Sequence, residues 1–205
     1  MQRMGATPVR RRLSKDARRA ELLRAGERVF SERPFEEVSI DDIATAAGIS
    51  KNLLYHYFTG KRELFLEVIR DSSRQMLDWT APDLELEPME RLRASLRAHL
   101  DYAEEHATGY SKLMRAAGTD EEVLAIVDGA RHEVVQRTLD TLPFPGGVAP
   151  PEVVLALHGW VGMVDNLTIE WLDDSHGLDK DGVCDLLVSL FVAVLTSAAG
   201  VPAPR

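Results

Sequence analysis

Apolar residues recur along most of the chain at the spacing of amphipathic helices. In the first such segment, which begins near Asp16, they form one continuous face, and the proline at position 34 would end the helix. Alternation of apolar and polar residues, the sign of a half-buried strand, is not seen in the sequence. The pattern predicts an all-α protein, and the first apolar face consists of Leu22, Ala25, Gly26, Val29 and Phe30.

A pair of short helices is predicted after that proline. Ser39 and Asp42 have the spacing of a capping box, which marks the start of a helix. Gly48 follows where a left-handed turn is needed, and Ser50 is placed to cap a third helix that reaches about Phe58. Two short helices joined by such a turn are typical of a helix-turn-helix module, whose second helix enters the DNA major groove.

The rest of the chain is predicted to contain longer helices separated by loops rich in Pro and Gly. The helix expected over 151–173 is apolar on all sides, and Gly159 and Gly162 would let another helix approach closely. We therefore predict a homodimer through residues 151–199; the alternative is that one copy of the chain covers both faces itself. The expected helices span about 61–79, 89–105, 110–117, 121–142, 151–173 and 179–199.

Charge is distributed unevenly. The net charge is −9, yet residues 1–62 contain 13 Lys and Arg against 8 Asp and Glu. A basic head on an acidic body suggests a polyanionic partner for the head, although a solvated basic tail would look the same. We predict a flexible basic arm over 1–15, a helix-turn-helix DNA-binding domain over 16–62, and a helical ligand-binding and dimerisation domain over 63–205.

The segment between Ser39 and Leu64 resembles the DNA-binding signature of the tetracycline-repressor (TetR) family. The resemblance rests on I-A-x-x-A-G-I-S, then L-Y-x-Y-F, then K-x-x-L, placed after one amphipathic helix near the N-terminus. Over the rest of the chain the resemblance is one of architecture. The matching residues are Ile43, Ala44, Ala47, Gly48, Ile49, Ser50, Leu54, Tyr55, Tyr57, Phe58, Lys61 and Leu64.

This resemblance implies a homodimer that binds a palindromic operator in double-stranded DNA, usually as a repressor released by a small-molecule effector. By position it implies phosphate contacts from Ser39 and Lys61, and contacts to base edges from Lys51, Asn52 and Leu53. Many relatives have a glycine or proline in place of Asn52 and a small residue in place of Leu53, so base preference cannot be transferred. The expected DNA-binding residues are Ser39, Ser50, Lys51, Asn52, Leu53, Tyr55, Tyr57 and Lys61.

Alternatives exist for individual members of this set. Tyr55 and Tyr57 could pack partly in the core, and Lys61 could be a surface lysine of a first helical turn. Ser39 and Ser50 are predicted helix caps whether or not they touch phosphate.

An effector pocket should be mostly apolar with a few polar groups. Each candidate residue is also compatible with an ordinary core position, and the identity of the effector is not encoded in any recognisable motif. Asp165 is unusual, because a carboxylate inside an apolar helix needs a partner or a wet cavity. The candidate pocket residues are Met76, Trp79, His99, Tyr102, Tyr110, Met114, Trp160, Met163 and Asn166.

Enzyme motifs such as a P-loop, G-x-G-x-x-G, G-x-S-x-G or H-E-x-x-H are missing from the sequence. Its six histidines are scattered, so we expect no enzyme, no metal and no cofactor. The one cysteine, Cys184, fits a reducing cytoplasm. The chain start lacks the apolar region of a secretory signal, and no run of about 18 uninterrupted apolar residues predicts a membrane span. We therefore expect a cytoplasmic transcriptional regulator.

Two other functions stay open at this point. The chain could be a helical regulator controlled by a protein partner, or a small-molecule-binding protein without DNA function. The polar set at positions 50–57, together with Lys61, argues against the second. In a ligand-controlled regulator, the helix expected over 61–79 adjoins both halves in sequence and would transmit the signal.

Overall fold

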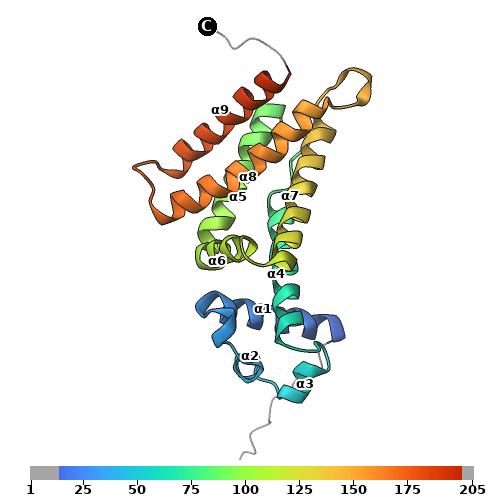
Figure 1. The fold of residues 1–205 in the computed structure, drawn as a ribbon, viewed down its shortest axis with the longest axis vertical. Helices are drawn as coiled ribbons and strands as arrows, with labels where there is room; N and C mark the ends of the chain where they lie inside the picture. Colours follow the sequence, from blue (N-terminus) through green and yellow to red (C-terminus); the bar gives the residue numbers. More distant parts are fainter. Residues whose placement is uncertain (1–13, 200–205) are drawn as a thin grey trace, which may run out of the picture. The chain divides into compact units, whose positions relative to one another are not determined.

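The computed structural model describes residues 14–199, so almost all of the arm predicted over 1–15 lies outside the described residues. This part of the chain consists of α-helices and two short 3-10 turns, without strands, which confirms the predicted all-α class (Figure 1). It divides into two compact units between Val68 and Ile69. We call residues 14–68 the N-terminal unit and residues 69–199 the C-terminal unit.

The N-terminal unit contains three helices and the beginning of a fourth. They are α1 (Lys15–Glu32), α2 (Ile40–Ala46), α3 (Lys51–Tyr55) and α4 (Lys61–Trp79), with the 3-10 turn η1 (Phe35–Glu37) after α1. Helix α4 runs across the boundary between the two units in sequence. The turn η1 was not predicted from the sequence.

Helices α2 and α3 begin at the caps predicted from the sequence. The Ser39 hydroxyl accepts a hydrogen bond from the Asp42 amide at 3.1 Å, and the Asp42 carboxylate accepts one from the Ser39 amide at 2.8 Å. This capping box satisfies two backbone donors that the helix itself leaves unpaired. Gly48 has a φ of +63°, which L-residues with a side chain rarely adopt, and it turns the chain from α2 into α3.

Apolar side chains from all four helices meet in one core. Gly26 marks the closest approach: a Cβ there would lie 2.9 Å from Cγ2 of Val68, so α1 packs on α4 because this residue has no side chain. Helix α3 ends at Tyr55, three residues before the predicted end, although the Phe58 amide still bonds to the Leu54 carbonyl. The side chains of Leu54 and Phe58 are buried in this core, together with Leu22, Ile43, Ala44 and Leu64.

The C-terminal unit begins within α4 and adds five helices. Short connections join α5 (Pro88–Glu105) to α6 (Ala107–Ala117) and α6 to α7 (Glu121–Thr141). A loop with the 3-10 turn Pro145–Gly147 leads to the last two helices, which pack side by side (Figure 1). These are α8 (Pro151–Asp173) and α9 (Lys180–Ala198), at bounds close to those predicted.

The core of this unit lies between α5, α7, α8 and α9. Trp160 on α8 meets Phe191 on α9 edge to face, with ring centroids 4.9 Å apart. Cys184 on α9 is 1% exposed and its thiol donates a hydrogen bond to the Arg93 carbonyl on α5. Burial raises the pKa of this thiol. Ion pairs at the edge of the core also join α5 to α9, namely Arg93–Asp185, Arg97–Asp181 and Lys180 with Asp101 and Glu104.

Helix α9 is long and apolar enough, by length and composition alone, to cross a membrane, with a mean hydropathy of 1.7 in its most apolar window. In that window 28% of the residues are buried within the chain. Its buried side consists of core residues such as Leu187, which is fully buried, whereas Leu186 is 40% exposed. The composition therefore fits a helix that is apolar on two sides, one of them covered by its own unit.

Candidate nucleic-acid interface and sensor region

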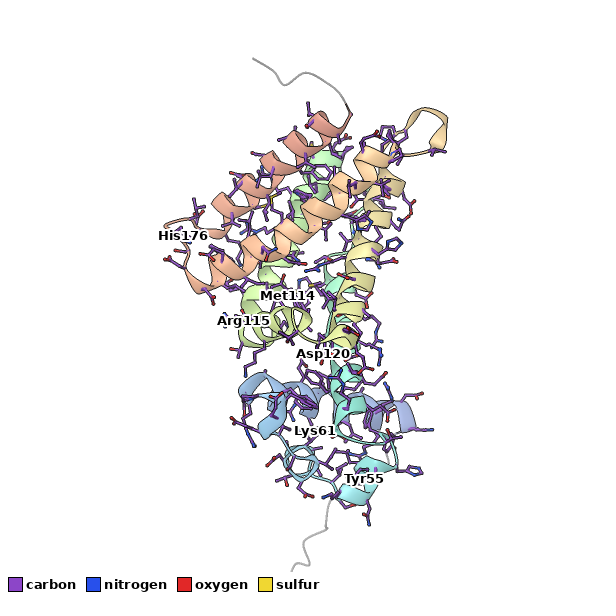
Figure 2. The ribbon with its side chains drawn as sticks, in the orientation of Figure 1. Tyr55, Lys61, Met114, Arg115, Asp120 and His176 are labelled. Atoms are coloured by element: carbon purple, nitrogen blue, oxygen red, sulfur yellow. The ribbon has the colours of Figure 1, made fainter. Side chains whose placement is uncertain are left out.

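Helix α3 presents its polar residues to solvent. Ser50 caps it by accepting a hydrogen bond from the Leu53 amide, and Leu54 faces inward and is fully buried. Leu53 and Tyr55 are 37% and 47% exposed, so these two large side chains of α3 lie outside the core of the unit. Figure 2 shows Tyr55 on α3. Six of the eight predicted DNA-contact residues are exposed, namely Ser39, Ser50, Lys51, Asn52, Leu53 and Tyr55.

Lys51 is held by an acidic neighbour in the free protein. Its Nζ lies 2.8 Å from Oδ2 of Asp41 on α2, and both side chains are well exposed. The hydrogen bond to Asp41 and its negative charge raise the pKa of Lys51. A phosphate or a base edge that binds Lys51 would have to compete with this carboxylate.

The remaining two predicted contact residues, Tyr57 and Lys61, are half-buried. Lys61, at the start of α4, donates a hydrogen bond to the Phe35 carbonyl at 2.6 Å, and its Nζ lies 4.1 Å from the centre of the Phe35 ring (Figure 2). Tyr57 packs against the core of the N-terminal unit. Lys61 therefore fastens α4 to the turn η1, and its ammonium keeps donors for one further partner.

A buried polar network occupies the C-terminal unit. The Asp165 carboxylate accepts a hydrogen bond from the Tyr110 hydroxyl at 3.0 Å and an ion-paired one from Arg131 Nε at 2.8 Å. His99 Nε2 lies 3.2 Å from the Thr168 hydroxyl and 3.4 Å from the Tyr110 hydroxyl. The partners of the Asp165 carboxylate are therefore Arg131 and Tyr110, which lie 34 and 55 residues away in the sequence, too far for a local pattern to pair them.

Burial determines the protonation of this network. It lowers the pKa of His99, and the Asp165 charge opposes that change. It raises the pKa of Tyr110 well above its ordinary value, with a further contribution from the Asp165 charge. Near neutral pH, His99 is thus neutral, and the Tyr110 proton is available for its hydrogen bond to Asp165.

The structure brings together some of the predicted pocket residues. His99 contacts Tyr110, and the partly exposed Trp79 meets the buried Tyr102 edge to face, with ring centroids 5.8 Å apart. Trp160 lies apart from these, because its indole donates to the Leu187 carbonyl within the α8–α9 core. Met76, Met114 and Met163 are half-buried, and Asn166 is exposed.

An open groove of about 330 Å³ lies between α4 and α7 within the C-terminal unit. The nine predicted pocket residues, all of them described, are absent from its lining. The groove was not predicted from the sequence, because its lining combines residues of α4 and α7 that are distant in the chain. It is lined by Arg70, Ser73, Arg74, Leu77, Ile126, Gly129, Ala130, Glu133 and Arg137.

Helices α8 and α9 each leave apolar side chains uncovered. Leu155 on α8 is 75% exposed, and Leu186 on α9 is 40% exposed. A Cβ added at Gly159 or Gly162 would meet no other atom of the described chain within 4 Å, so their lack of a side chain has no use inside this unit. We call this surface, around Leu155, Gly159, Gly162 and Leu186, the α8–α9 face.

Two family models match the chain on either side of the boundary between the units. "Bacterial regulatory proteins, tetR family" matches residues 22–68, and "Tetracyclin repressor-like, C-terminal domain" matches residues 88–194. The second match alone extends over more than half of the 205 residues.

Named relatives agree with these models. The "HTH-type transcriptional activator FasR" of Mycolicibacterium smegmatis is 29% identical over 85% of this chain and 81% of its own length. The "HTH-type transcriptional repressor KstR2" of Mycobacterium tuberculosis is 34% identical over 44% of this chain and 46% of its own length.

A solved structure extends the agreement to the fold. The crystal structure of a tetR-family transcriptional regulator from Streptomyces coelicolor superposes with a TM-score of 0.76 at 29% identity, over 92% of this chain and 84% of that one. Helix α3 is the second helix of the helix-turn-helix module, the position of the DNA-recognition helix, and its polar side is exposed. This chain belongs to the TetR family and is a DNA-binding transcriptional regulator.

Proposed function

We propose that this regulator is a homodimeric repressor, which binds a palindromic operator through α3 and is released from it by a small-molecule effector. The observation that carries the proposal is the exposed side of α3, where Lys51, Asn52 and Leu53 stand free of the core while Leu54 anchors the helix. In the TetR family such a helix reads base edges, and two copies read two half-sites.

The proposed contacts fall into two groups. Lys51, Asn52 and Leu53 would meet base edges, because they lie on the exposed side of the first turn of α3. Phosphate contacts would come from the hydroxyls of Ser39, Ser50, Tyr55 and Tyr57 and from the ammonium of Lys61. Lys61 would bind phosphate without leaving Phe35, because an ammonium has three donors.

The homodimer is proposed to form through residues 151–199, with the α8–α9 face at its centre. Support comes from the exposed Leu155 and Leu186 and from Gly159 and Gly162, where an added Cβ would have room among the described residues. Apolar surface of this kind is usually covered in soluble proteins. Two-fold packing would also fix the separation of the two copies of α3, which half-sites about 34 Å apart require.

The effector site is proposed to lie in the C-terminal unit, among the residues predicted from the sequence. Support comes from the neighbouring pairs Trp79–Tyr102 and His99–Tyr110. Helix α4 would carry the signal, because it holds both Lys61 and Trp79. A coupling of about 1–3 kcal/mol between effector and DNA would lower DNA affinity roughly 5- to 150-fold.

An operator-binding experiment tests the DNA contacts. Genomic fragments around the gene provide the probe, and fluorescence anisotropy at several salt concentrations gives the affinity, which should fall steeply as salt rises. Lys61→Ala, which removes a proposed phosphate contact, should weaken binding to all fragments and reduce the slope of log affinity against log salt by about one. Lys51→Ala, which removes a proposed base contact, should change the base preference more than the overall affinity. A protein that binds no fragment above background at low salt would refute the proposal.

The ion pair between Lys51 and Asp41 allows a second test of the contact between Lys51 and DNA. Asp41→Asn removes the carboxylate that competes for Lys51, so it should raise operator affinity. Glu36→Gln is the control, since it removes an equal exposed charge of the same unit that has no contact with Lys51 in the structure. Equal effects of the two substitutions would show that only net charge matters and that Lys51 does not contact DNA.

Activation is the second candidate for the direction of control, and it is favoured by the name of the FasR relative, which aligns over most of this chain. Transcription in vitro from a promoter that carries the operator decides between the two. A repressor lowers transcript yield and an effector restores it, whereas an activator raises yield. Control by a protein partner would instead leave DNA binding unaffected by small molecules. We propose a cytoplasmic location and no enzymatic activity.

A further inference from the structure

We propose that His132 and His158 form a two-histidine binding site for a transition-metal ion of the Zn²⁺ type on the surface of the C-terminal unit. The two residues are 26 positions apart in the sequence and lie on different helices, α7 and α8. Their imidazole rings are neighbours, with centroids 5.7 Å apart and ring planes 25° from parallel. Both side chains are exposed to solvent in the single chain, and His158 lies on α8 within the range 151–199 proposed for the homodimer.

The separation of the rings suits chelation. With Zn–N bonds of about 2.0–2.1 Å and a roughly tetrahedral angle at the metal, two imidazoles that share one ion have centroids roughly 5–6 Å apart. The observed 5.7 Å lies in that range. Because χ2 of an exposed histidine turns easily, each ring can direct a nitrogen towards a common ion without movement of the backbone.

The helices that carry the two histidines are fixed to one another. Val135, one turn after His132, and Leu157, next to His158, are fully buried in the same core. The ion pair between Arg131 and Asp165 also joins α7 to α8. The rings are therefore held at chelating distance before any metal arrives, and binding would need little ordering.

Imidazole nitrogen is a ligand for Zn²⁺, Ni²⁺ and Cu²⁺ and a poor one for Mg²⁺ and Ca²⁺. Among the described residues, no group of three or more His, Cys, Asp or Glu is placed to hold a metal ion, so the chain would supply two ligands and water the rest. Nearby carboxylates are engaged elsewhere, Asp128 with Arg131 and Glu133 with Arg137. We expect a reversible site, open at two coordination positions.

The test uses the full-length protein without a polyhistidine tag. Isothermal titration with ZnCl₂ should show one ion per protomer, and the ring-nitrogen NMR signals of two histidines should shift together. His132→Ala and His158→Ala should each lower the affinity at least about tenfold, the loss caused by removal of even an outer-shell partner of a metal ligand. Zn²⁺ should also raise the thermal midpoint of the wild type by about 2–4 °C and leave both variants unchanged.

His176→Asn is the matched control. This histidine is exposed, has no second imidazole beside it, and has a φ of +50°, a conformation that asparagine tolerates. The control should bind Zn²⁺ as the wild type does, and circular dichroism of the metal-free variants establishes that all of them fold. Zn²⁺ affinity that survives in both His132→Ala and His158→Ala, or that falls equally in His176→Asn, would overturn the proposal.

Discussion

Arg131 holds the carboxylate of Asp165 inside the C-terminal unit, with Nε of Arg131 2.8 Å from Oδ2 of Asp165. The Asp165 side chain is 8% exposed and the Arg131 side chain 28% exposed. Tyr110 hydrogen-bonds to the other carboxylate oxygen. A carboxylate this deep in an apolar helix bundle is tolerated because each of its two oxygens accepts a hydrogen bond.

Arg131→Met should therefore destabilise the protein strongly. Removing one partner of a buried pair leaves the other charge uncompensated, and we expect a loss of about 3 kcal/mol in the free energy of unfolding by urea. Arg115→Met is the control, because Arg115 and Asp173 form a similar pair at 3.0 Å that is largely exposed, for which the loss should be below about 1 kcal/mol. Equal losses in the two variants would contradict a structural role for the buried pair.

The buried His99 should make the protein sensitive to acid. Its pKa in the folded state lies below the ordinary value of 6.5, so as the pH falls below 6.5 the unfolded chain takes up the proton first. Stability is then complete above pH 6.5 and declines below it, at most by about 1.4 kcal/mol per pH unit for a single group.

His99→Gln tests this effect, since glutamine can still hydrogen-bond to Thr168 and does not titrate. Urea midpoints between pH 5 and 7.5 should fall more steeply for the wild type than for the variant. The exposed His176 beside Glu170 acts in the opposite direction, because its pKa is raised, and it is present in both proteins. Parallel curves for the two proteins would show that His99 is not the acid-sensitive group.

Two substitutions of Ser50 separate its role as the N-cap of α3 from its proposed role as a phosphate contact. Ser50→Ala removes the cap of α3 and should lower stability by about 1 kcal/mol, with weaker DNA binding as a consequence. Ser50→Asp keeps a cap of equal quality but places a carboxylate at the proposed phosphate contact. It should keep its thermal midpoint and lose DNA affinity; a Ser50→Asp protein that binds DNA like the wild type would place this residue outside the interface.

The α8–α9 face provides a direct test of the homodimer. Leu155→Asp puts a charge on a position that is 75% exposed within one chain, so the protomer should still fold. Light scattering at micromolar concentration should then detect a monomer in place of the wild-type dimer, and operator affinity should fall with it. Leu84→Asp, at a position 66% exposed in the loop before α5, should stay dimeric. A wild-type monomer would refute the proposed interface.

Local signals in the sequence predicted most of the helices. Ser39 with Asp42, Ser50 and Gly48 specify caps and a turn by their own chemistry, and the structure has them at those positions. The end of α3 was predicted three residues too far, because Phe58 continues the apolar spacing and the i to i−4 bond while the backbone has left the helix. The 3-10 turn at Phe35 was not predicted, because no side chain caps its start.

Contacts between distant helices could not be predicted in this way. Asp165 was recognised as needing a partner, but Arg131 becomes that partner through the packing of α7 on α8. The histidines looked scattered in the sequence, yet the same packing brings His132 to His158. A local pattern contains the period of each helix, and it contains no information on which turn of one helix faces which turn of another.

The burial of Cys184 has a practical consequence. It is the one cysteine of the chain, and thiol reagents react with the thiolate, which burial and the raised pKa both disfavour here. A cysteine introduced at an exposed position of α3, such as Asn52, would therefore take up a spin label or a fluorophore selectively without removal of the native thiol. In a homodimer each chain would carry one label, so the distance between the two copies of α3 becomes measurable in solution, free, on DNA and with an effector.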